Sequence, residues 1–309
     1  MSKVLAVLLW PAGIALLCCV GAVLARRGQH SPVAGQGAPV PNPPEPTGGS
    51  GAPAAPGERR ARAQATRAQA TRAQVRNVLR FLLLVAAGVA LIYAVMIPLA
   101  WLAEHFGPAI DRHIFYWTTS HQVPAWKHVM KVATQVGGKY PTAIVAVVAA
   151  IALAATWHGD RWLPVVALVS LVVIAHYLTF AIHLVIHRSP PPGSHGTFPS
   201  GGAARAVAVY GLVAYLAWRG FRGGRKVAVW LTVAVAVLSF NEAYSRGYLA
   251  VHWFTDILGG LVYGCLLLAL YIAAVRAVAG PVPAGWAQES ARPPPAAPSR
   301  RGAPLRAHR

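Results

Sequence analysis

Seven apolar stretches divide this chain, and they constrain its fold more than any other feature. A helix needs about 17 to 25 apolar residues to cross the hydrocarbon core of a bilayer. Since that core holds no water to satisfy backbone groups, such stretches form helices. The stretches cover residues 4–25, 79–103, 141–157, 163–186, 203–218, 227–243 and 257–279. The sequence therefore predicts an all-α, polytopic membrane bundle, with a six-helix core and one N-terminal anchor helix standing apart.

The composition agrees with a bilayer as the solvent, because 56% of residues are hydrophobic and only 12% are charged. The formal net charge is +20, which in a soluble protein would suggest a nucleic-acid partner. Here the arginines sit beside apolar stretches, where anionic membrane lipids supply the counter-charge. We therefore expect lipid headgroups as partners and no nucleic acid.

The chain falls into four predicted parts. Residues 1–25 are a membrane anchor or signal-like helix, and an uncleaved anchor is the preferred interpretation. Residues 26–78 form a linker that is rich in Pro, Gly and Ala up to residue 57 and then basic and helix-forming, a composition typical of disorder in its first part. Residues 79–279 carry the membrane domain. Residues 280–309 are predicted to be a disordered basic tail.

Lysine and arginine gather in three segments that alternate along the chain, and this predicts the orientation. They are the stretch before residue 79, the loop at 219–226 and the tail, which begins with Arg276. Short cytoplasmic loops carry the excess of positive charge in membrane proteins. The sequence therefore predicts a multi-pass protein of the cell membrane whose segments 104–140, 187–202 and 244–256 face away from the cytoplasm.

The segment before the last apolar stretch holds an ordered set of reactive side chains. His252 and Asp256 are four residues apart, so on a helix the carboxylate would hold one imidazole nitrogen and leave the other free to attack. Arg246 would bind a phosphate with two hydrogen bonds. The plainer alternative is a snorkelling arginine beside a His–Asp pair that satisfies itself. Because these ionisable residues occur together at the end of a spanning helix, we favour a functional site over this alternative.

This pattern, S-R-x5-H-x3-D from Ser245 to Asp256, resembles the third signature of the type-2 phosphatidic acid phosphatase and vanadium haloperoxidase superfamily. The second signature of that family, P-S-G-H, is similar to Pro199-Ser200-Gly201-Gly202. Ser200 is expected to cap the next helix, whose first amides form an anion cradle left open by the glycines. Gly202 stands where the family has a histidine that protonates the leaving oxygen.

The first signature, K-x6-R-P, is matched by the segment from His183 to Pro191. His183 stands at the lysine position and Pro190 at the arginine position. His183 is therefore expected to act as a weak cation near the phosphate. Arg188 lies two residues before Pro190 and is expected to reach the same oxygens.

Histidines offer two further interpretations. His195 is predicted to replace the missing acid, because it lies in a loop and histidine titrates near neutral pH. An exposed histidine without a role is the alternative. His176, His183 and His187 share one helix stripe, for which a polar seam inside the bundle is preferred to a metal site because no carboxylate or thiol accompanies them. We expect no metal and no cofactor.

The resemblance implies hydrolysis of a lipid phosphate or diphosphate through a phosphohistidine on His252, and the charge distribution predicts that this site is at the outer membrane face. The alternative is a catalytically impaired member that binds lipid phosphate or serves as a membrane assembly partner, since three motif positions depart from the family pattern. A transporter ranks last, because paired Gly- or Pro-broken helices are absent from the sequence.

Overall fold

The computed structural model of this chain describes residues 56–157, 160–186 and 188–279. These residues form eight helices and no strand, which confirms the predicted all-α fold. The predicted anchor at 4–25 and the tail at 280–309 lie outside the described residues. In chain order, the helices are α2 (Pro56–Phe106), α3 (Pro108–Ser120), α4 (Pro124–Ala133), α5 (Lys139–Thr156), α6 (Trp162–Val185), α7 (Gly201–Gly220), α8 (Arg225–Tyr248) and α9 (Phe254–Ala279).

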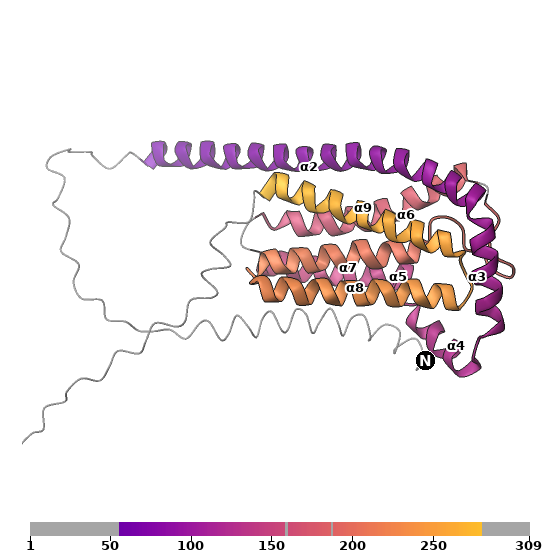
Figure 1. Cartoon of the computed structure of the whole chain (residues 1–309). Coiled ribbons are helices and arrows are strands. Elements are labelled where there is room, and N and C mark those ends of the chain that lie inside the picture. The colour runs from indigo at the N-terminus through magenta and orange to yellow at the C-terminus, as the bar shows by residue number, and fades with distance from the viewer. Residues whose placement is uncertain (1–55, 158–159, 187, 280–309) are drawn as a thin grey trace, which may run out of the picture.

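Six of these helices are long and apolar enough to cross a membrane, as the apolar stretches predict. In the described part of the chain they are α2, α5, α6, α7, α8 and α9. They lie roughly parallel as one bundle, in which α2 packs chiefly along α9 (Figure 1). The protein is therefore a multi-pass membrane protein.

Helix α2 is much longer than a membrane crossing requires. Its 51 residues extend over about 75 Å at 1.5 Å per residue, against about 30 Å of hydrocarbon. Among its side chains whose burial is described, the fully buried ones begin at Phe81 and continue with Val85. The basic part before residue 79, predicted as the end of the linker, is helical from Pro56 and runs past the end of the bundle (Figure 1).

Helix α7 is the centre of the bundle. In its membrane span 67% of the residues are buried, against 11% in α8, and it packs on α5, α6, α8 and α9. Its small residues allow close helix contacts, which is how helices associate in lipid. A Cβ on Gly264 of α9, for example, would stand only 2.7 Å from the Ala204 carbonyl oxygen of α7.

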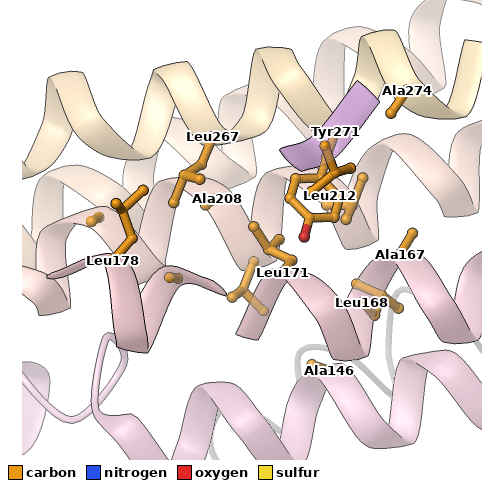
Figure 2. Close-up of a cluster of buried hydrophobic side chains, with 14 of the residues drawn as sticks. Ala146, Ala167, Leu168, Leu171, Leu178, Ala208, Leu212, Leu267, Tyr271 and Ala274 are labelled. Carbon is orange, nitrogen blue, oxygen red and sulfur yellow. The ribbon is translucent and has the colours of Figure 1, made fainter. Parts of the chain in front are cut away.

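The apolar core joins α6, α7 and α9. Figure 2 shows Leu171 and Leu178 of α6, Leu212 of α7 and Leu267 and Tyr271 of α9 packed together. Because lipid tails are as apolar as leucine, such packing stabilises the bundle through van der Waals contact. The core thereby fixes the relative heights of these three helices, and so the place where their ends meet.

One end of the bundle is covered by the segment predicted as the outer loop 104–140. Helix α3 crosses that end (Figure 1), and both α3 and α4 begin with a proline, Pro108 and Pro124, at a position that tolerates the missing N–H. Tyr116 and Trp117 of α3 are more than 60% exposed, as interfacial aromatic anchors are. At this end α6 and α8 finish and α7 and α9 begin.

Candidate active site

A cavity of about 530 Å³ lies at this end, where α6 ends and α7 begins. The loop at residues 193–199 and the link from α8 to α9 complete its walls. The fold thus brings residues of three separate sequence motifs to one place. The cavity is lined by six of the nine predicted site residues, namely His183, His195, Gly201, Gly202, Arg246 and His252.

Arg246 and His252 lie side by side in the cavity. Nη1 of Arg246 is 3.2 Å from Nε2 of His252. Since a guanidinium only donates hydrogen bonds, Nε2 is the acceptor and the ring proton is on Nδ1. An imidazole with an unprotonated nitrogen facing the cavity is in the form that attacks an electrophile.

Asp256 faces the other side of the same ring. Its Oδ2 is 3.9 Å from Nδ1 of His252, beyond hydrogen-bond range, and that buried Nδ1 has no hydrogen-bond partner among the described residues. The prediction that one helix carries both residues is wrong. His252 lies in the link before α9, and Asp256 in the first turn accepts the Trp253 amide at 3.1 Å, as in a capping box.

Glu242 holds Arg246 from one helical turn earlier on α8. Nε of Arg246 is 2.5 Å from Oε1 of Glu242, and Oε2 accepts the Gly137 amide at 2.8 Å. Glu242 is fully buried, and a buried carboxylate is stable only with such partners. These contacts fix the base of the guanidinium and leave its outer nitrogens at the cavity.

Gly202 provides the space that Arg246 occupies. A Cβ at position 202 would overlap the Nη2, Cζ and Nε atoms of Arg246, so the side chain would have to move. The position at which the resembling family has a histidine is therefore filled by a guanidinium from another helix.

Ser200 occupies the predicted N-cap position of α7, but its side chain forms no cap. Its Oγ is buried with no hydrogen-bond partner among the described residues, which corrects the predicted capping bond. Its amide donates to the Asp256 carbonyl at 2.9 Å and is thus not available to an anion. The amides that follow, at Gly201, Gly202 and Ala203, belong to the first turn and lack an acceptor within the helix.

Arg188 lies behind Asp256 and does not line the cavity. Its Nη1 donates to Oδ1 of Asp256 at 2.6 Å and to Oγ1 of Thr255 at 2.8 Å, while Nη2 pairs with Asp111 of α3. Asp111 also accepts the Thr255 amide at 2.9 Å. Because both ends of this guanidinium already face carboxylates, the geometry does not support the predicted phosphate contact.

The predicted histidines have different settings. His183 is in the last turn of α6, and its Nε2 lies 2.9 Å from Oγ1 of Thr197. His195 is exposed in the loop that lines the cavity, and His176 joins the lining from α6. His187 lies outside the described residues. Within the described ranges, no group of three or more His, Cys, Asp or Glu residues is placed to hold a metal ion.

Comparison with known proteins identifies the family. The model of the PAP2 superfamily matches residues 81–279, which include every element of the cavity. This chain belongs to the PAP2 superfamily. The predicted resemblance is thereby confirmed.

Two known proteins from Bacillus subtilis are similar to this chain. Phosphatidylglycerophosphatase B of Bacillus subtilis (strain 168) is 35% identical over 74 residues, which make up 24% of this chain and only 36% of that relative. The crystal structure of the first transmembrane PAP2 type phosphatidylglycerolphosphate phosphatase from Bacillus subtilis covers 64% of this chain and 94% of its own, with a TM-score of 0.51 and 23% identity. At that identity the structural likeness shows a shared fold.

Two polar residues of this PAP2 site escaped the sequence analysis. Glu242 and Arg205 both fall inside apolar stretches, at 227–243 and 203–218. Arg205 lines the cavity and donates from Nε to the Gly137 carbonyl at 3.0 Å. Ionisable residues inside spanning helices are rare and mostly functional, so their position alone was the signal that could have found them.

Proposed function

We propose that this PAP2 protein hydrolyses a lipid phosphate or diphosphate through a phosphohistidine intermediate on His252. The observation that carries the proposal is the pairing of Nε2 of His252 with Arg246, in a cavity where none of the described lining residues is an Asp or Glu. A nucleophile beside a cation that Glu242 holds in place suits attack on a phosphate. Both Bacillus proteins are named as phosphatases of phosphatidylglycerol phosphate, and those names describe the same class of reaction.

In the first half-reaction, Nε2 of His252 attacks phosphorus, so that a P–N bond forms while the P–O bond to the leaving group breaks. Arg246 turns from Nε2 to the phosphate oxygens, and the amides of Gly201 and Gly202 bind the same group. The ring becomes cationic and its Nδ1–H moves into hydrogen-bond range of Asp256. The leaving oxygen takes one proton from an acid.

In the second half-reaction, water attacks the phosphohistidine. The P–N bond breaks, inorganic phosphate leaves, and the proton of the attacking water returns to the acid. His252 is again neutral, so the cycle consumes one water per phosphate ester. Arg246 and the helix amides hold the charge that develops on phosphorus in both steps.

His195 is the proposed acid, because Gly202 removes the one expected from the family pattern. It is exposed on a loop that lines the cavity, so it can approach the leaving oxygen. A His195→Ala variant should lower kcat by about 100-fold, the lower range of general-acid effects. Unchanged turnover in this variant would leave water as the proton donor.

The deep wall of the cavity supports a lipid as the substrate. His176, Thr179 and Phe180 line it from inside the spanning helix α6, up to about two and a half turns from the end of that helix. Phe180 is 55% exposed. A substrate whose phosphate is at His252 can therefore place its chain beside apolar protein surface at membrane depth.

The active site is proposed to face away from the cytoplasm, with the basic start of α2 among anionic lipid headgroups. Basic residues lie at the opposite end from the cavity, namely Arg222 in the turn after α7 and Arg225 and Lys226 at the start of α8. Short loops with such charge stay inside. A reporter protein fused after Gly223 should lie on the cytoplasmic side of the membrane, and one fused after His121 should lie on the outer side. The reverse pattern would overturn this orientation.

The enzymatic proposal is tested with purified protein in detergent and a panel of lipid phosphates and diphosphates. Wild type should release phosphate, and His252→Ala should abolish the release. His128→Ala is the matched control, because His128 is an exposed histidine of α4 away from the cavity. Equal rates in wild type and His252→Ala would contradict the proposal.

A binding protein without turnover is the second candidate. It is favoured by one observation, which is that Arg246 fills the space where the family places its acid. Lipid-phosphate binding without phosphate release from any member of the panel would support this candidate, as a lipid-binding or membrane assembly component.

A further inference from the structure

Arg205 is the charged residue of the cavity that the proposed reaction leaves unused. It lies in the first turns of α7, and its Nε donates to the Gly137 carbonyl at 3.0 Å. That bond fixes the plane of the guanidinium. Among the residues that the structure describes, it is the only hydrogen bond of the Arg205 side chain, so both Nη groups are available to a ligand.

The charge balance around Arg205 is incomplete. Glu242 interacts electrostatically with it, but the oxygens of Glu242 are already bound by Arg246 and the Gly137 amide. Two arginines therefore share one carboxylate, and the lining residues that the structure describes include no Asp or Glu. A partly buried cation inside a membrane bundle is costly unless an anion accompanies it, and the cavity is where an anion can enter.

We propose that Arg205 is the second phosphate-binding cation of this site. His183 and Pro190 stand at the two cationic positions of the first family signature, so that signature supplies no permanent charge. Arg205 supplies it from α7 instead. The identity of the ligand as a phosphate ester rests on the proposed function, whereas anion binding by Arg205 does not require turnover.

The first turn of α7 explains how the two arginines meet one anion. Nη1 of Arg205 is 3.1 Å from the point where a Cβ on Gly201 would stand, and Arg246 occupies the corresponding space at Gly202. Both guanidinium groups thus lie beside the first turn of α7, whose first amides lack an acceptor within the helix. A phosphate at these amides accepts hydrogen bonds from the helix and from both arginines.

Equilibrium binding of orthovanadate, an analogue of phosphate, tests this proposal without depending on catalysis. Isothermal titration calorimetry on the full chain in detergent would compare wild type with Arg205→Gln and Arg205→Lys. Arg219→Gln is the matched control, since Arg219 is a buried arginine at the far end of the same helix that donates to the Ala279 carbonyl at 2.7 Å. Tryptophan fluorescence during heating reports folding of each variant.

Arg205→Gln should weaken orthovanadate binding by about 10- to 100-fold, the effect of removing a charge-assisted hydrogen bond. Arg205→Lys should weaken it by a smaller factor, because lysine keeps the positive charge but loses the two parallel hydrogen bonds that a guanidinium can donate. Arg219→Gln should bind as wild type does. If Arg205→Gln does not fold, Arg205→Lys decides alone.

The proposal is overturned if a folded Arg205→Gln variant binds orthovanadate with wild-type affinity. If only Arg205→Lys folds, wild-type affinity in that variant overturns it. A wild type that binds no orthovanadate also overturns it. A wild type that binds orthovanadate through Arg205 but hydrolyses no lipid phosphate keeps this proposal and rejects the enzymatic one. If the wild type is active, orthovanadate should also inhibit Arg205→Gln more weakly than wild type, by the same factor as the loss of binding affinity.

Discussion

Nη1 of Arg246 donates to Nε2 of His252 over 3.2 Å, so the cation of the site covers the nitrogen that attacks in the proposed reaction. Substrate binding therefore has to exchange this hydrogen bond for one to phosphate. Glu242 binds the Nε end of the guanidinium and so keeps Arg246 beside the cavity during this exchange. The imidazole and the guanidinium are thus already aligned in the cavity.

Replacing Glu242 by glutamine should reduce kcat/KM by about 10- to 100-fold, because a charge-assisted hydrogen bond to Arg246 is lost. Steady-state kinetics in detergent check this. Asn241→Ala is a suitable control, since Asn241 is the preceding residue of α8 and bonds only to the Ala133 carbonyl among described residues. Similar kinetics in the two variants would show that Glu242 does not position Arg246.

Placing histidine at position 202, as in the family pattern, should lower activity. The new side chain would displace Arg246 from the space over Gly202, and the loss of that contact should cost about 10-fold or more in kcat/KM. Gly202→Ala separates the effect of bulk from that of the imidazole. A Gly202→His variant more active than wild type would mean that Arg246 adapts and that an acid is the limiting deficiency.

Arg188 should contribute to stability more than to phosphate binding. Asp111→Asn removes one of its two carboxylate partners, and breaking a buried pair should destabilise the protein by about 3 kcal/mol. The unfolding midpoint in detergent measures this effect, and Arg188→Met should lower it as well.

Orthovanadate affinity decides between the two roles of Arg188. A folded Arg188→Met variant should keep wild-type affinity, because the guanidinium faces Asp111 and Asp256. Loss of affinity with an unchanged unfolding midpoint would instead favour the direct phosphate contact expected from the sequence.

A methyl group at Gly260 should disturb the start of α7. Its Cβ would press on the Ser200 carbonyl oxygen, and such overpacking should cost about 1 to 3 kcal/mol. Gly247→Ala is the matched control, because there the nearest atom is Cδ1 of Ile257 at 3.5 Å and helix propensity should stabilise by up to about 1 kcal/mol. Unfolding midpoints in the same detergent compare the two. Equal midpoints would contradict the close contact.

The helical architecture was predictable because each spanning helix forms its backbone hydrogen bonds within one stretch of sequence. The positions of α5 to α9 follow from that rule. The two short helices α3 and α4 were not predicted, since their apolar residues are too few to separate an interfacial helix from a loop.

Motif spacing was a partial guide to the site. It placed Arg246 and His252 in one cavity, but the spacing of His252 and Asp256 was misread as one helix. Spacing alone does not tell where a helix begins, and α9 begins at Phe254.

The sequence by itself determined that the chain spans a membrane repeatedly and that three motifs occur in family order, because hydropathy and local spacing are properties of neighbouring residues. Only the tertiary structure decided which cations reach the cavity. Arg188, close to the first motif, turns away to two buried carboxylates, while Arg205, outside every motif, lines the cavity. The physical reason is that a side chain's partners are set by the packing of helices distant in sequence, here α3, α7, α8 and α9.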